Sequence, residues 1–466
     1  MFLNAFDQDP LKPYTVRTTL SLACAAAALA AAPLAAQSTR GAARAGTPIT
    51  PALAAETFDS AWAVIDRTLW DTAVVNGPWR RVREELRPRA TEARTVQQLR
   101  AVLDEALKRL PYSHFDLIPG EVQQDIGAEN DRGGDAGMDV RLVDGRILVT
   151  RVDSGGPAAV AGVRTGWTVD GVGTRTARQL LEAVDRIPGA REPRKQQLFT
   201  WMAASGALRG APGSRLSVRF LDAADRPVTK ALALRTPATM TEKFGNLPRM
   251  DVRLATRRAP LPGGGTAGVV RFNYWMPVVV NGLNAAVDSF RALDGMVIDL
   301  RGNLGGAGFL APGFAGHFVD RPDTLGVMRM RSATLNFVIN PRRVDTQARP
   351  VRPFAGPVAV LTDAMSASTS EFFAGGLRQL GRVRVFGQPT AGAALPAWAR
   401  KLPNGDVLMH AVADFTGPGG VRWEGDGVTP DVAAPPTRAA LLAGRDPALD
   451  AALAWIAQER GRAGAR

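Results

Sequence analysis

Two short apolar segments, each followed by a turn and a helical pattern, constrain the fold of this chain more than any other feature. They read GMVIDL (295–300) and GPVAVLTD (356–363). Apolar runs of this length are typical of strands buried on both faces, and helices between such strands cover a parallel sheet. We therefore predict an α/β layer structure over residues 244–440, closed by a C-terminal helix within 441–466.

The chain has 466 residues, which is too long for one ordinary core, so we expect a multidomain α/β (α+β) protein. Residues 56–118 carry apolar side chains at the spacing of one helical face. This spacing predicts a small N-terminal helical domain. His114, in the segment SHFDL near its end, is interpreted as a packing or helix-end residue.

Residues 125–237 have a different pattern, in which strands dominate and GGPAAVAGVRTGWTVDGVG (155–173) reads as a short helix, a turn and a strand. This run resembles the core of a PDZ domain, and GGDAGMDV (133–140) lies where such domains carry a carboxylate-binding loop. Two features depart from the pattern. Trp167 replaces a usual acidic residue, and the segment 188–213 is longer than a PDZ domain needs. A β-rich domain without a ligand is the alternative.

Residues 17–37 combine a basic start, an alanine-rich apolar run and a small-residue cleavage site. We interpret residues 1–36 as a secretory signal peptide and 37–55 as a linker, which predicts export to the periplasm or the cell exterior. Acidic residues before this segment suit a signal poorly, so the true start is expected near Val16. Cys24, the single cysteine, would leave with the signal, and the mature chain would carry no thiol.

The charge composition argues against nucleic acid as a partner. The formal net charge is +13, but the arginines that dominate it are scattered rather than gathered on one helix or stripe. With three histidines in the whole chain, a histidine-rich metal site is not expected, and no cofactor is predicted. The apolar run near the N-terminus is too short for a convincing membrane span, so no integral membrane segment is expected in the mature chain.

Two strand–turn–helix corners carry the candidate chemistry. In VIDLRGNLGG (297–306), glycines follow a strand, and their N–H groups can point into a cleft; a plain connection or a phosphate loop is the alternative. In SASTSE (366–371), Ser368 stands at the start of a helix just beyond a buried strand, where helix amides stabilise developing negative charge. Ser368 and Glu371 also form a capping-box pattern, which is the structural alternative.

The two corners, followed by GQPTAG (387–392), LPNGD (402–406) and EGDGVTPDV (424–432), resemble the tail-specific (C-terminal-processing) serine protease family in order and spacing. The resemblance covers most of the chain after the signal. It implies a core like that of ClpP and crotonase, joined to a helical and a PDZ domain. It also implies cleavage of polypeptides near their C-termini without a metal. The residues that it assigns are the nucleophile Ser368, the oxyanion amides of Gly305 and Thr369, and the carboxylate-binding Gly137 and Met138.

The general base is missing from the places where the family carries it. Many members have a lysine where this chain has Ala393, and a branch has a histidine where this chain has Arg271, whose guanidinium stays charged. The remaining candidates are Lys401, His410, His317 and Asp414. A carboxylate of ordinary pKa is a poor base for serine, which weakens the case for the aspartate.

The hairpin around Asn404-Gly405 limits these candidates further. A two-residue turn there would pair Ala399 with His410. Lys401 and His410 would then share the face of Ala393, but at roughly 20–26 Å from it along the strands. No base is assigned from the sequence.

We therefore expect an exported serine endopeptidase that forms an acyl-enzyme on Ser368. One alternative is an inactive protease-like scaffold that binds polypeptide C-termini through its PDZ-like domain. Another is a hydrolase of small acyl substrates on the same fold. The sequence leaves the physiological substrate and the oligomeric state open.

Overall fold

The computed structural model describes residues 46–120, 133–186, 192–247 and 249–464, so the predicted signal peptide lies outside them. Helix α1 (Pro51–Thr68) begins inside the predicted linker. The Leu53 N–H donates to Thr50 Oγ1 at 3.2 Å, and proline suits the first helical position, so the linker prediction ran too far. Across these ranges, no helix combines the length and the apolar character needed to span a bilayer.

A six-stranded sheet organises the C-terminal half, in the order β12-β13-β14-β17-β18-β22. Five neighbouring strands run parallel, and β12 pairs antiparallel with β13. The strands are β12 (Leu254–Pro260), β13 (Thr266–Phe272), β14 (Gly295–Asp299), β17 (Val358–Thr362), β18 (Arg384–Gly387) and β22 (Val432–Ala433). This is the α/β layer structure predicted from the apolar segments.

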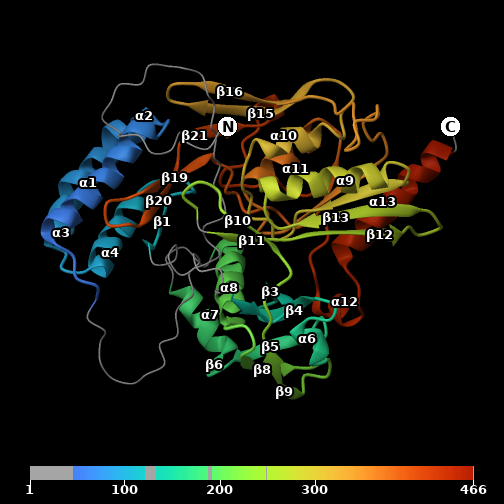
Figure 1. Cartoon of the computed structure of the whole chain (residues 1–466), viewed down its shortest axis with the longest axis horizontal. Coiled ribbons are helices and arrows are strands. Elements are labelled where there is room, and N and C mark those ends of the chain that lie inside the picture. Colours follow the sequence, from blue (N-terminus) through green and yellow to red (C-terminus); the bar gives the residue numbers. More distant parts are fainter. Residues whose placement is uncertain (1–45, 121–132, 187–191, 248, 465–466) are drawn as a thin grey trace.

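Helices cover both faces of this sheet. Successive strand side chains point to opposite faces, and because they are apolar, each face needs helices to bury them. Met296 and Ile298 pack with α9, α10 and α11, while Val297 packs on the opposite face against α13 (Figure 1). The helices of this half are α9 (Val280–Phe290), α10 (Leu310–Ala315), α11 (Thr369–Gln379), α12 (Arg438–Leu442) and α13 (Pro447–Gly464), with 3-10 turns at Pro277–Val279 and Pro418–Gly420.

The N-terminal helices pack against a hairpin from the C-terminal half. Strand β1 (Asp116–Ile118) pairs with β20 (Val407–Ala411), which pairs with β19 (Ala397–Lys401). Leu402 and Leu408 lie in the same apolar cluster as these helices. The other elements are α2 (Thr72–Val74), a π-helical turn (Val75–Trp79), α3 (Arg80–Glu92) and α4 (Val96–Leu107). The N-terminal segment is thereby joined to the C-terminal half.

The hairpin register differs from the prediction. Trp398, not Ala399, pairs with His410, and Lys401 pairs with Val407. The Leu402 N–H donates to Asp406 O at 2.7 Å, so the turn is longer than the two residues Asn404-Gly405. The proline before this dipeptide favours a turn that starts one residue earlier. Because a shift of one residue exchanges the faces, Lys401 and His410 lie on opposite sides of the hairpin.

Residues 133–237, called the middle unit below, form a separate antiparallel sheet in the order β3-β4-β5-β8-β9, with its own apolar core. Its strands are β2 (Gly134–Asp135), β3 (Met138–Val143), β4 (Arg146–Val152), β5 (Thr168–Val172), β6 (Arg175–Thr176), β7 (Arg209–Gly210), β8 (Arg215–Leu221) and β9 (Pro227–Ala233). Its helices are α6 (Pro157–Val160), α7 (Ala177–Asp185) and α8 (Pro193–Ala207). Figure 1 shows α8 standing between this unit and the large sheet.

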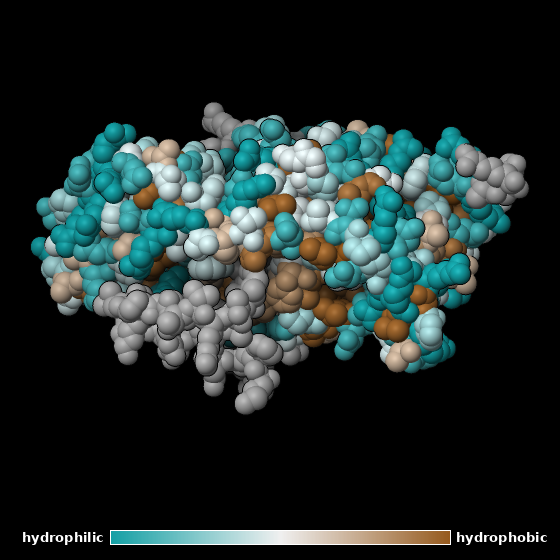
Figure 2. Space-filling model, turned by 90° about the horizontal axis from the view of Figure 1, so that it is seen from above, coloured by the Kyte–Doolittle hydropathy of each residue, from teal (hydrophilic) through white to brown (hydrophobic). Residues whose placement is uncertain are grey.

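Three smaller sheets complete the fold of the described residues: β2 with β7, β10 (Met240–Glu242) with β11 (Met250–Val252), and β16 (Thr334–Ile339) with β15 (Asp323–Met330) and β21 (Ala413–Thr416). The face in Figure 2 is mostly hydrophilic, with hydrophobic residues gathered near its middle. Large apolar side chains with high exposure include Phe309 and Val160.

Candidate active site

The two predicted corners lie side by side. Strands β14 and β17 are parallel neighbours, so their carboxyl ends meet at one edge of the sheet. Three hydrogen bonds join the corners: Ser366 Oγ donates to Leu300 O (2.8 Å), the Ala367 N–H to Asn303 O (3.0 Å), and Thr369 Oγ1 to Gly306 O (2.9 Å). The glycine turn thus faces the first turn of α11.

Asp363, at the end of β17, holds both corners through one carboxylate. Its Oδ1 accepts the Gly302 N–H of the glycine corner at 2.9 Å and the Met365 N–H of the serine corner at 3.0 Å. Its Oδ2 accepts Arg141 Nε, from β3 of the middle unit, at 3.2 Å. One buried carboxylate therefore fixes the position of the glycine corner relative to the serine corner, and Arg141 pairs with that carboxylate.

Ser368 has a strained backbone and an unpartnered hydroxyl. Its φ is 55° and its ψ is −115°, a conformation that costs a non-glycine residue on the order of 1–3 kcal/mol. The side chain is buried, and its Oγ finds no hydrogen-bond partner in the part of the chain that the structure describes. The predicted capping box with Glu371 is present: the Ser368 N–H donates to Glu371 Oε2 at 2.9 Å, and the Ser368 side chain faces the Glu371 N–H without a hydrogen bond of regular geometry.

Glu371 anchors the loop that contains Ala393. Its carboxylate is fully buried and accepts hydrogen bonds from Thr390 Oγ1 (2.6 Å), the Gly392 N–H (2.8 Å) and the Ala393 N–H (3.1 Å), in addition to Ser368. Burial raises the pKa of Glu371 to about 7, although these hydrogen bonds favour the ionised form. The predicted resemblance implies a lysine at position 393. This chain has Ala393 there, in a loop whose backbone is bound by the Glu371 carboxylate.

We expect the change Glu371→Gln to destabilise the protein by about 2–4 kcal/mol. An amide has one acceptor oxygen, so two of the four donors around this group would lose their acceptor. Urea unfolding measures the loss. The change Glu84→Gln on the exposed face of α3 is the control and should leave the midpoint unaltered. Equal midpoints for both variants would contradict this account of Glu371.

The four candidate bases named from the sequence do not gather around Ser368. His410 Nδ1 lies 3.2 Å from Thr68 Oγ1, and His317 Nε2 lies 2.8 Å from Asn284 Oδ1. Burial lowers the pKa of each histidine to about 3. Asp414 pairs with Arg422 at 2.6 Å. Lys401 is exposed on β19, and Arg271 lies between Asp139 and Asp299 at 3.7 and 3.6 Å.

A histidine that sequence reasoning assigned to packing belongs to a polar network beside the serine corner. Ser113 Oγ lies 2.7 Å from His114 Nδ1 and donates to Glu424 Oε2 at 3.0 Å, and the Ser113 N–H donates to Glu424 Oε1 at 2.7 Å. Glu424 Oε2 also accepts the Ala394 N–H at 2.9 Å. The preceding residue, Ala393, accepts the Ser368 N–H at 2.9 Å. Two adjacent alanines therefore connect the network to the serine.

The environment of His114 suits a proton acceptor. Its backbone φ is 63°. Among the described residues other than glycine, His114 and Ser368 are the two that are buried and have a positive φ. Strain of this kind clusters at functional sites. Burial lowers the pKa of His114 to about 4, so the imidazole is neutral at pH 7, and burial raises the pKa of Glu424. No sequence signal marked this histidine, because its left-handed backbone and its carboxylate partner appear only in the folded chain.

The predicted oxyanion amides lie at the meeting point of the corners. Among described residues, the Thr369 and Gly306 N–H groups make no hydrogen bond, whereas the Gly305 N–H donates to Asn303 Oδ1 at 3.0 Å. In the middle unit, the Gly137 N–H donates to Asp135 Oδ1 at 2.8 Å, and Met138 begins β3 opposite Val152. The assignments of Gly305, Thr369, Gly137 and Met138 stay predictions.

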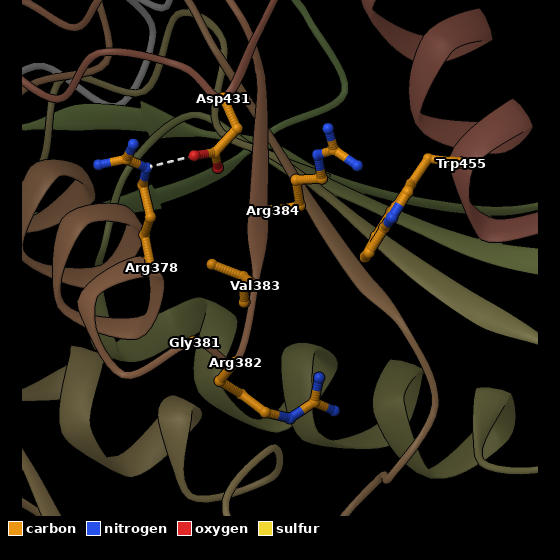
Figure 3. Close-up of a pocket in the computed structure, with 7 residues that line it drawn as sticks. All are labelled: Arg378, Gly381, Arg382, Val383, Arg384, Asp431 and Trp455. Atoms are coloured by element: carbon orange, nitrogen blue, oxygen red, sulfur yellow. Dashed lines mark hydrogen bonds and ion pairs between the residues drawn. The ribbon is translucent and has the colours of Figure 1, made fainter. Parts of the chain in front are cut away.

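A separate surface hollow lies beyond the other end of α11 (Figure 3). Arg378 pairs there with Asp431 at 2.7 Å, and the Arg384 guanidinium lies 5.9 Å from the Trp455 ring. Ser368 precedes the first residue of α11, and an α-helix rises about 1.5 Å per residue, so this hollow is remote from the serine. It is not part of the candidate site.

Residues 266–434, which contain both corners and Glu424, match the model of peptidase family S41. The predicted resemblance is confirmed. A chloroplastic C-terminal processing peptidase of Tetradesmus obliquus is 26% identical over 80% of this chain and 76% of its own length. The chloroplastic carboxyl-terminal-processing peptidase 2 of Arabidopsis thaliana is 25% identical over 80% of this chain and 67% of its own length.

Two solved protease structures share the fold of this chain. The photosystem II D1 C-terminal processing protease superposes with a TM-score of 0.52 at 20% identity, over 83% of this chain and 94% of its own. Mature CPAF in complex with lactacystin superposes with a TM-score of 0.58 at 12% identity, over 88% of this chain and 99% of its own. At these identities the likeness shows the fold alone, and the roles of single residues rest on the contacts described above.

Proposed function

We propose that this chain is an exported serine endopeptidase that cleaves polypeptides through an acyl-enzyme on Ser368. The S41 match and the C-terminal processing relatives support a peptidase. The observation that carries the proposal is the unpartnered hydroxyl of Ser368, next to the network of His114, Ser113 and Glu424. Nothing else in the site uses that hydroxyl.

In the proposed reaction, His114 accepts the proton of Ser368 Oγ while the oxygen attacks the scissile carbonyl. The amides of Thr369 and of the glycine corner stabilise the oxyanion of the tetrahedral intermediate. The protonated imidazole then gives its proton to the leaving amine, the acyl-enzyme forms, and water hydrolyses it by the reverse roles. Ser113 and Glu424 orient the imidazole through Nδ1 and stabilise its charged form.

The alternative of an inactive polypeptide-holding scaffold rested on the missing base. The network of His114 supplies a candidate for that role, so the reason for the scaffold is weakened. A fluorophosphonate probe separates the two. It should label the parent protein at Ser368, as mass spectrometry of the labelled peptide would report. A protein that stays unlabelled while a control serine peptidase reacts would favour the scaffold.

We expect the change Ser113→Ala to lower kcat by about 10- to 100-fold and to leave KM nearly unaltered, because Ser113 connects His114 to Glu424 without itself reacting. Steady-state cleavage of a quenched peptide measures both constants. A kcat equal to that of the parent would remove Ser113 from the mechanism.

Export stays part of the proposal, since the segment that carries the predicted signal lies outside the described residues. N-terminal sequencing of the secreted protein should start near Gln37. A mature chain that begins at Met1 would contradict it. How the enzyme selects the position of the cut is a separate question.

A further inference from the structure

Helix α8 lies where a peptide ligand of the middle unit would bind. The helix is inserted between α7 and β8, in the segment that is longer than a PDZ domain needs. It packs alongside β3 and against α7 (Figure 1). Strand β3 is the edge strand of its sheet, and among the described residues no strand pairs with its outer edge. Peptides that PDZ domains capture add to such an edge.

Two sides of α8 are buried against different parts of the chain. Thr200 and Ala204 are buried, and Ala204 lies in the core of the middle unit. Leu198 and Trp201 instead pack against the core of the S41 domain. Trp201 Nε1 also donates to Asp139 Oδ1, on β3, at 3.2 Å. The helix is therefore held between two cores and is not a loosely attached insertion.

The Gly137 N–H, which is predicted to bind a substrate's terminal carboxylate, already donates to the carboxylate of Asp135. The Gly137 N–H donates to Asp135 Oδ1 at 2.8 Å, and the other oxygen of Asp135 pairs with Arg253. A substrate carboxylate would have to displace this ion-paired side chain. The Gly137 amide is thus occupied by the chain itself, and α8 packs alongside the edge strand β3 to which a peptide would add.

The N-terminus of α8 is attached to the loops of the candidate active site. Arg194 donates through Nη2 to Gly425 O (2.8 Å) and through Nη1 to Asp426 O (2.6 Å), with a longer contact to Thr390 O (3.4 Å). Thr390 binds Glu371, and Gly425 follows Glu424. One guanidinium therefore connects the loop whose Thr390 binds Glu371 with the loop that carries Glu424.

We infer that α8 is a built-in ligand of the middle unit. It occupies the peptide site and, through Arg194, holds the loops of Thr390 and Glu424 in place. This inference rests on the proposed peptidase function and specifies its substrate class: polypeptides taken without recognition of a free C-terminal carboxylate. Arg194 is a positioning residue in this scheme.

The test uses one quenched peptide made in two forms, with a free C-terminal carboxylate and with a C-terminal amide, and with the cleavage site well inside the peptide. We expect the two forms to have kcat/KM values within about twofold of each other. A preference of tenfold or more for the free carboxylate would overturn the inference.

A binding measurement separates this inference from the proposed function. The Ser368→Ala protein is titrated against fluorescent versions of both peptides, and anisotropy reports binding without turnover. Affinities that do not distinguish carboxylate from amide support the built-in ligand even if the parent protein cuts neither peptide. Carboxylate-dependent binding overturns it even if the parent protein is an active peptidase.

The loop-holding role predicts that Arg194→Ala lowers kcat by about tenfold with little change in KM, and that Arg194→Lys recovers part of the loss. The control is Arg178→Ala on α7, whose side chain is 85% exposed and contacts Glu182 at 3.6 Å. It should keep the parent constants. An unaltered kcat in Arg194→Ala would show that α8 does not support the catalytic loops.

Discussion

Replacing Ser368 by alanine is expected to abolish peptide hydrolysis and to leave the protein as stable as before or slightly more stable. Loss of the nucleophile should lower kcat by on the order of 10⁵-fold. The hydroxyl is buried without a hydrogen-bond partner among the described residues, so its removal relieves an unsatisfied polar group and should change stability by about 1 kcal/mol or less. Cleavage of an unfolded protein and thermal unfolding measure the two effects.

Ser370→Ala is the matched control for stability. Its Oγ accepts the Trp275 Nε1–H at 3.0 Å and donates to Asn303 O at 3.1 Å, so its loss leaves buried partners unsatisfied. We expect a destabilisation of about 1–3 kcal/mol, opposite in sign to the Ser368 variant. If Ser368→Ala is the less stable of the two, the hydroxyl has a structural partner and its assignment as nucleophile loses its physical basis.

His114→Gly is expected to lower kcat by about 10³-fold, because the serine loses its proton acceptor. Glycine tolerates the φ of 63° at this position, so the backbone should keep its path while an imidazole-sized space opens. Added imidazole should then restore part of the activity. Restoration is the decisive readout, since a variant that is merely misfolded cannot be rescued by a small base.

The pH dependence of the parent enzyme should follow the same residue. A histidine whose pKa is lowered to about 4 is neutral above that pH and accepts a proton there; below it, the imidazolium forms and cannot act as a base. We therefore expect the parent protein to show an acid limb of kcat/KM centred near pH 4 that His114→Gly lacks. A parent profile without that limb would argue against His114 in this environment.

The order of strands and helices in residues 244–440 could be predicted because the signal is local. Two apolar segments ending in Gly and Ser turns imply parallel neighbours with adjacent carboxyl ends, and the structure places the corners together. The hairpin register could not be predicted from Asn404-Gly405 alone, because the proline before it selected a longer turn.

The base could not be found in the sequence for a different reason. Lys401 and His410 are candidates because Lys401 is the only lysine after Lys243 and His410 is one of two histidines there, whereas His114 lies on a segment far from Ser368. The contact depends on Ser113 meeting Glu424, and on a left-handed backbone at the histidine. Neither is encoded in a local pattern. The proposed assignment rests on the hydrogen bonds that lead from His114 through Glu424 to the segment bonded to Ser368, and only the folded chain provides them.

The pairing of β1 with β20 affects when activity can first arise. During synthesis, the segment with His114 leaves the ribosome early, and the segments with Ser368 and Glu424 leave late. In the proposed mechanism, His114 and Ser368 can act together only after β1 pairs with β20, a strand that is synthesised much later. On that proposal, a chain that has not yet folded would have no peptidase activity.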